Sequence, residues 1–154
     1  MVKLNSIKRS ELKKAYRMHR KGFIPTFLKY FDRINPIFES FKKFNNFYNH
    51  PDLYMFWIMF DGKAVGEIWI TVSNDTVKLA RLFVLKEFQN RGIAQQAIRN
   101  AENLFPGNKR WCLDTIKQEK NNCHLYEKMG YISFGTERKI NKRMTIINYE
   151  KRME

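Results

Sequence analysis

The chain has 154 residues, of which 44% are hydrophobic and 15% aromatic, a composition that suits one folded domain with a sizeable core over residues 1–154. This composition excludes an intrinsically disordered chain, and no run approaches the roughly 20 apolar residues that span a bilayer. The first residues lack the apolar core of a secretion signal, and two cysteines make no disulfide framework. We therefore expect a reduced, cytoplasmic setting without membrane contact.

The formal net charge of +14 permits an anionic partner without identifying one. A basic nucleic-acid-binding module is therefore one alternative function. However, the cations are spread along the whole chain, no recognised nucleic-acid-binding motif occurs, and most aromatic residues follow the periodicity of a core. The sequence thus argues against nucleic acid as the partner.

The first third of the chain predicts a strand followed by helices. Val2 to Ile7 is typical of a short strand, and Ser10 is the predicted cap of a helix. Gly22 and Pro25 predict a break or kink, with a second helical piece after it. Asn35-Pro36 predicts another helix, with proline in its first turn. The aromatic residues recur at helical spacing and indicate core, or else part of the wall of an acceptor pocket.

Three strands joined by tight turns follow. Leu53 to Phe60 is a near-continuous apolar run, as in a buried strand. Asp61-Gly62 is a strong two-residue hairpin turn. Lys63 to Val72 and Thr76 to Leu85 continue as the second and third strands. This pattern predicts an antiparallel meander.

The remainder of the chain predicts alternating helices and strands. A helix begins at Gly92 and ends at Pro106-Gly107-Asn108. It is followed by a strand at Arg110 to Ile116, a helix at Asn121 to Lys128, and a closing hairpin of Tyr131 to Thr136 and Arg143 to Tyr149. Together the elements predict an α/β (α+β) fold, a mixed, mostly antiparallel twisted sheet with helices on both faces.

The turn between the third meander strand and its helix predicts an anion site. It has the order Gln-x-x-Gly-x-Ala from Gln89 to Ala94. Small residues at Gly92 and Ala94 let another molecule approach the backbone, and the first amides of the helix have no internal partner. These features suit a pyrophosphate. The segment lacks both the Gly-Lys-Ser/Thr of a P-loop and the G-x-G-x-x-G dinucleotide fingerprint.

A second motif lies further along the chain, where the helix residues Leu125-Tyr126-Glu127-Lys128 are closed by Gly130-Tyr131. In this order, the turn and the helix resemble the two signatures of the GNAT superfamily of N-acetyltransferases. The resemblance covers Leu53 to Tyr149. It implies a GNAT-like fold, acetyl-coenzyme A (acetyl-CoA) as cosubstrate and an amine as acceptor. It also leaves room for a homodimer, because dimers are common in that superfamily.

The resemblance implies which residues hold acetyl-CoA. Leu82, Phe83 and Val84 should pair through their backbone with the pantetheine arm, as an added strand would. Amides between Asn90 and Gln95 should hold the pyrophosphate. The implied cofactor-binding set is Leu82, Phe83, Val84, Gln89, Asn90, Arg91, Gly92, Ile93, Ala94, Gln95, Asn122 and Tyr126.

Three residues are candidates for the chemistry. A free alkylamine has a pKa of about 10.4, so the acceptor needs a base or a water path to lose its proton. Tyr126 matches the family tyrosine whose hydroxyl faces the cofactor sulfur, and it is the candidate acid. The alternative is a half-buried packing aromatic. Asp114 and Glu67 lie on strands and are the candidate bases, although either could be an exposed or paired carboxylate.

One departure from the family concerns an asparagine that its members often carry seven residues before this tyrosine. That position is Glu119 here. Asn122 shares a helix face with Tyr126 and is the candidate substitute, or else a capping or first-turn residue.

Two questions stay open at the level of sequence. A non-catalytic acyl-CoA sensor with this fold is an alternative to an enzyme. The acceptor depends on the first helices, their loop and the closing hairpin, where no motif identifies it; a small amine, an antibiotic, an amino-acid derivative and a peptide N-terminus all remain. The two cysteines and His124 lack paired metal-ligand spacing, so we expect no metal.

Overall fold

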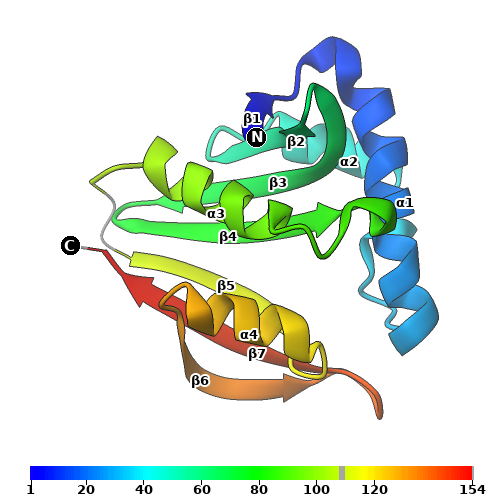
Figure 1. The fold of residues 1–154 in the computed structure, drawn as a ribbon. Helices are drawn as coiled ribbons and strands as arrows, with labels where there is room; N and C mark the ends of the chain where they lie inside the picture. The colour runs from blue at the N-terminus through cyan, green and yellow to red at the C-terminus, as the bar shows by residue number, and fades with distance from the viewer. Residues whose placement is uncertain (108–109, 154) are drawn as a thin grey trace.

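A seven-stranded sheet forms the centre of this computed structural model, which describes residues 1–107 and 110–153 (Figure 1). Its strand order is β1-β2-β3-β4-β5-β7-β6, with β4 and β5 parallel and the other neighbours antiparallel. Asn108 of the predicted helix-ending loop lies outside the described residues. The strands are β1 (Val2–Ser6), β2 (Leu53–Phe60), β3 (Lys63–Ser73), β4 (Thr76–Val84), β5 (Arg110–Ile116), β6 (Ile132–Lys139) and β7 (Thr145–Arg152).

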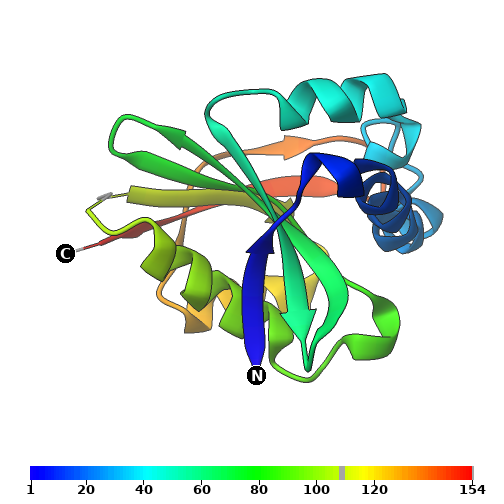
Figure 2. The same cartoon turned by 90° about the horizontal axis from the view of Figure 1, so that it is seen from above.

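Helices cover both faces of the sheet, so the predicted mixed, mostly antiparallel architecture is confirmed (Figure 2). One face carries α1 (Leu12–Tyr30) and α2 (Phe41–Tyr48), and the other carries α3 (Ile93–Leu104) and α4 (Lys120–Lys128). Three short 3-10 turns complete the described elements: η1 (Arg9–Glu11), η2 (Pro36–Phe38) and η3 (Lys86–Phe88). None of the described helices is both long and apolar enough to cross a bilayer.

The hydrophobic core lies on both sides of the sheet. A larger cluster packs α3 and α4 against the strands and includes Ile98 and Trp111. A smaller cluster lies under α1 and α2 and includes Ala15, Phe44 and Trp69. Because β2 and β3 are covered on both faces, their sequences are nearly continuous apolar runs rather than alternating ones.

Of the break or kink predicted in the first helix, the break and the separate second piece are wrong, because α1 runs without interruption through Gly22 and Pro25. Pro25 removes one helical hydrogen bond, but packing on both sides of it holds the helix: Ala15 lies in the core below α2, and Tyr30 packs at the start of β7. At Gly22 the helix lies close against Phe83 of the sheet. A Cβ placed there would lie 2.2 Å from a ring carbon of Phe83.

The helix predicted to begin at Asn35-Pro36 is only partly correct. Asn35-Pro36 opens the single turn η2, in which the Asn35 side chain accepts a hydrogen bond from the Ile37 amide at 3.0 Å. The helix α2 begins later, at Phe41, where the Ser40 hydroxyl caps it by accepting from the Lys43 amide at 3.1 Å. The predicted cap Ser10 instead lies within η1.

The parallel strands β4 and β5 separate partway along their length. Their register pairs Thr76–Leu79 with Arg110–Leu113, whereas β4 continues to Val84 and β5 to Ile116. Figure 1 shows the two strands diverging toward the end of the sheet that α1 crosses. This separation opens the sheet between its two halves and creates room for a site.

Candidate active site

A cavity of about 880 Å³ lies where β4 and β5 separate. Three segments form its wall: the second half of α1, the stretch from the end of β4 into α3, and the beginning of α4. The lining residues are 21–26, 29 and 30, then 82–90 and 92–95, and finally 119, 121, 122, 125 and 126. Segments distant in sequence thus meet around one space.

The cavity brings together eleven of the twelve residues that the sequence placed at the cofactor. They are Leu82, Phe83, Val84, Gln89, Asn90, Gly92, Ile93, Ala94, Gln95, Asn122 and Tyr126. The twelfth, Arg91, does not line it. Its guanidinium lies 5.5 Å from the ring centre of Phe88 and donates to the Glu87 carbonyl at 3.4 Å.

The turn before α3 is held in a shape that exposes its backbone to the cavity. Gly92, at the N-cap of α3, has φ +76°, and a Cβ built on it would meet nothing within 4 Å. Gln89 Nε2 donates to the Val84 carbonyl at 2.8 Å and ties the turn to the end of β4. The first amides of α3 have no helical acceptor and lie at the positive end of the helix dipole. The arrangement is chemically suited to an anion.

Tyr126 lies at the inner wall of the cavity. Its side chain is 6% exposed and packs edge-on against Tyr131 at 6.2 Å between ring centres. Burial, followed by the charge of Cys123, raises the pKa of Tyr126 above its ordinary value of 10. The phenol therefore stays protonated across the neutral range, as a proton donor must.

Asp114 does not reach the cavity. It is exposed on β5, on the opposite face of the strand from the buried Leu113, and its carboxylate pairs with Lys78 at 3.2 Å. This is the paired-carboxylate alternative that the sequence left open.

Glu67 is buried beside the cavity rather than in its wall. Its register partner across β3 and β4 is Phe83, which does line the cavity. Glu67 is 1% exposed, and its Oε1 accepts from Trp69 Nε1 at 3.2 Å and contacts His19 Nδ1 at 3.0 Å. Its Oε2 has no hydrogen-bond partner among the described residues.

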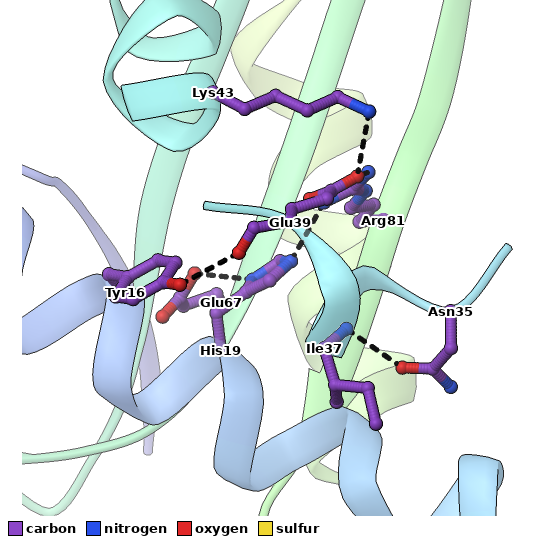
Figure 3. A network of polar contacts seen from close by, with 8 residues as sticks. All are labelled: Tyr16, His19, Asn35, Ile37, Glu39, Lys43, Glu67 and Arg81. Carbon is purple, nitrogen blue, oxygen red and sulfur yellow. Dashed lines mark hydrogen bonds and ion pairs between the residues drawn. The ribbon is translucent and has the colours of Figure 1, made fainter. Parts of the chain in front are cut away.

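His19 lies between Glu67 and the charged pair of Arg81 and Glu39 (Figure 3). Arg81 Nη1 lies 3.0 Å from His19 Nε2. A guanidinium can only donate, so Nε2 accepts and the imidazole proton lies on Nδ1, where it donates to Glu67. Burial, then the charge of Arg81, lowers the pKa of His19 to about 2, while burial raises the pKa of Glu67 well above its ordinary value.

Arg81 in turn anchors the connection between α1 and α2. Its guanidinium forms two hydrogen bonds with the Glu39 carboxylate, at 2.7 and 2.6 Å, and stacks 4.7 Å above the ring of Trp69. Tyr16 donates to the Glu39 carbonyl at 2.7 Å. Sequence reasoning missed both Arg81 and Glu39, because neither belongs to a motif.

Glu119 also lines the cavity, at the position where the family often has asparagine. Its Oε2 accepts from Lys29 Nζ at 2.5 Å and from the Tyr30 hydroxyl, both at the end of α1. Burial works to raise the pKa of Glu119, but these hydrogen bonds and the charge of Lys29 outweigh it and hold the pKa below its ordinary value. The carboxylate is therefore ionised at neutral pH.

No group of three or more His, Cys, Asp or Glu side chains within residues 1–107 and 110–153 could hold a metal ion.

Solved structures of N-acetyltransferases share this fold. The ribosomal-protein-S18-alanine N-acetyltransferase of Escherichia coli is 18% identical, with a TM-score of 0.77 over 99% of this chain and 94% of that one. The spermidine N-acetyltransferase of Vibrio cholerae, in complex with CoA and spermine, is 17% identical, with a TM-score of 0.77 over 98% and 95% of the two chains. The PaiA N-acetyltransferase of Thermoplasma acidophilum, in complex with coenzyme A, is 14% identical, with a TM-score of 0.71 over 99% of each chain.

At the level of sequence, no curated protein matches this chain. Residues 12–131, however, match the profile of the acetyltransferase (GNAT) family. That range contains the turn from Gln89 to Ala94, the Tyr126 helix and all the residues that line the cavity. The protein is therefore a member of the GNAT family of acetyltransferases.

Proposed function

We propose that this protein transfers the acetyl group of acetyl-CoA to a primary amine by direct attack of the amine on the thioester. One observation carries the proposal: the turn with free helix amides and the buried, protonated Tyr126 face the same cavity at the opening between β4 and β5. An anion-binding end and a proton donor are what this reaction requires of one site.

Two segments of the cavity wall bind different parts of acetyl-CoA. The backbone of Leu82 to Val84, on the side of β4 that no longer pairs with β5, pairs with the pantetheine arm in the manner of an added strand. The amides that follow Asn90 hold the pyrophosphate, and the lysines at 21 and 86 supply cations at the same cavity. The open space at Gly92 allows phosphate oxygens to approach the backbone.

Proton movements follow from the positions of the polar groups. The amine loses a proton and its nitrogen forms a bond to the carbonyl carbon. The carbon–sulfur bond then breaks, and the Tyr126 hydroxyl gives its proton to the departing sulfur. Asp114 is tied to Lys78 away from the cavity, and Glu67 lies behind Phe83. Of the bases left open by the sequence, we therefore propose that water takes the amine proton, and that Tyr126 regains its own from solvent.

The test is a transfer assay on a panel of primary amines with acetyl-CoA, read by mass spectrometry of the products. Calorimetry with acetyl-CoA accompanies it. We expect affinity for the cosubstrate and at least one acetylated amine. Binding without any product over a broad panel would instead support an acyl-CoA sensor. Salt-dependent retention on nucleic acid without affinity for coenzyme A would support the nucleic-acid alternative.

A further inference from the structure

The carboxylate of Glu119 already holds an alkylammonium group at the wall of the cavity. That group is Lys29 Nζ, 2.5 Å from Glu119 Oε2, and the Tyr30 hydroxyl donates to the same oxygen. Glu119 Oε1 makes no hydrogen bond with any described residue. The Glu119 carboxylate thus binds a cation at the cavity, and in this structure the cation is the Lys29 ammonium group.

The ion pair of Lys29 and Glu119 is one that a ligand can exchange. The Lys29 side chain is 61% exposed and the Glu119 side chain 29%. Exposed ion pairs add little stability, because a flexible lysine loses rotational freedom when it is held and water screens the charges. An ammonium group delivered by a bound ligand can replace Lys29 at small cost.

Glu119 lies at a defined distance from the proton donor. Glu119 is the N-cap of α4 and stands seven positions before Tyr126, and both residues line the cavity. With a rise of 1.5 Å per residue, the two positions are separated by roughly 10 Å along the helix. The wall around this span includes apolar residues, Leu125 from α4 and Phe23, Ile24 and Pro25 from α1, together with the polar Asn121 and Asn122 of α4.

We propose that Glu119 binds a second, non-reacting ammonium group of the acceptor, in place of Lys29, so that the preferred acceptors are diamines with an apolar spacer of roughly 10 Å. This inference rests on the proposed acetyl transfer in the same cavity. The bound ammonium is not the reacting one, because a carboxylate partner would keep the attacking nitrogen protonated. The reacting amine lies at the Tyr126 end, and the methylene chain packs on the apolar residues Leu125, Phe23, Ile24 and Pro25.

The first experiment is calorimetry on the protein loaded with CoA, which needs no turnover. The ligands are α,ω-diamines from propane to decane, each paired with the monoamine of the same length. We expect a medium-length diamine to bind about tenfold more tightly than its monoamine, the size of one charge-assisted contact. Equal affinities along the whole series would overturn the proposal.

Two variants should change the affinity for diamines in opposite directions. Glu119→Gln should remove the preference for diamines, whereas Lys29→Met should strengthen diamine binding because the internal competitor is gone. A pair with only a structural role would not produce this tightening. Lys29 is exposed, so its variant should fold even if Glu119→Gln does not. Glu137→Gln on β6, which breaks the exposed pair of Glu137 with Lys117, is the matched control and should leave diamine binding unchanged.

Transfer assays separate this inference from the proposed function. If monoamines and diamines are acetylated equally well, and Glu119→Gln has no effect, the diamine site is refuted while the acetyltransferase stands. If diamines bind selectively through Glu119 but no amine is ever acetylated, the cation site stands and the proposed transfer is refuted.

Discussion

The hydroxyl of Tyr126 can be tested apart from its ring. Tyr126→Phe keeps the packing against Tyr131 and removes the proposed proton donor. Because protonation of the leaving sulfur occurs in the transition state, kcat should fall by roughly 100-fold, while KM for acetyl-CoA should move much less. Single-turnover rates with an accepted amine are the measurement. Equal rates for the two proteins would show that Tyr126 is only a packing residue.

Gly92 offers a second test at the residue scale, and the chain supplies its control. Gly92→Glu places a side chain and a negative charge where phosphate is expected, so acetyl-CoA binding should be lost in a folded protein. Gly62, in the turn between β2 and β3, also has a positive φ (+79°) and no atom within 4 Å of a built Cβ. Gly62→Glu therefore carries the same strain and charge away from the cavity.

The comparison of these two variants separates an effect on acetyl-CoA binding from the effect of backbone strain on stability. Both should lose similar stability in thermal unfolding, because both force a side chain into the left-handed region. In calorimetry only Gly92→Glu should lose affinity. If it binds acetyl-CoA as tightly as Gly62→Glu does, the turn is not the phosphate site.

Residues in local motifs could be predicted, and residues that act through distant contacts could not. The turn at Gly92 and the helix at Tyr126 are short patterns, and the cavity unites them. Glu119 was noticed only as a departure from a motif. Its partners Lys29 and Tyr30 lie 90 and 89 positions away, so no local pattern points to them. The partner of Asp114 is likewise hidden in sequence, because Lys78 lies 36 positions away on the neighbouring strand β4.

At the scale of elements, strands followed their apolar patterns closely, but the first helix did not follow its residue propensities. Leu53–Phe60 and Arg110–Ile116 have the predicted bounds because turn residues flank both. In α1, glycine and proline predicted a break or kink, and the helix is not broken. Tertiary packing overrides that propensity, since the helix contacts the middle strands before Gly22 and the start of β7 after Pro25.

Gly22→Ala tests whether close packing selects this glycine. Alanine favours a helix interior by roughly 1 kcal/mol, but its Cβ would lie 2.2 to 2.6 Å from three ring atoms of Phe83. That ring is itself held by His19 and Phe23, at 5.6 and 5.4 Å between ring centres, and cannot swing away freely. Overpacking typically costs about 1–3 kcal/mol, so the balance should be a net loss of stability.

Denaturant unfolding measures the result, with Arg17→Ala on the exposed side of α1 as the control. Arg17→Ala should stay near the wild type. Because Phe83 lines the cavity, Gly22→Ala should also weaken acetyl-CoA binding. A stabilised Gly22→Ala protein would mean that propensity alone decides at this position.

At the scale of the whole molecule, the end of α1 joins the two halves of the sheet across their opening. Tyr30 packs against Met144 and Ile146, its hydroxyl bonds to Glu119, and its carbonyl accepts from Asn141 Nδ2 at 2.9 Å. The short parallel pairing of β4 with β5 is therefore supplemented by a helix that spans the gap. This bridge also forms one wall of the cavity, which couples the stability of the fold to the shape of the site.

The buried pair of His19 and Glu67 should give the protein an optimum of stability in pH. The pKa of His19 is about 2 in the fold against an ordinary 6.5, so the unfolded chain binds the extra proton first and stability is lost as pH falls below 6.5. The pKa of Glu67 is raised in the fold, so the folded state holds its proton longer. The stability that Glu67 contributes is fully present below its ordinary pKa of 4.5 and is lost as the pH rises toward its pKa in the folded protein.

Glu67→Gln removes the loss of stability that Glu67 causes as the pH rises. The glutamine oxygen can still accept from His19 and Trp69, and its amide cannot ionise. The stability of the variant relative to the wild type should therefore improve as pH rises above 4.5, by at most about 1.4 kcal/mol per pH unit. Urea unfolding at a series of pH values from 5 to about 9 measures this difference. Glu137→Gln, at an exposed carboxylate, should give a flat difference, and an equally flat difference for Glu67→Gln would show that burial does not shift the titration of Glu67.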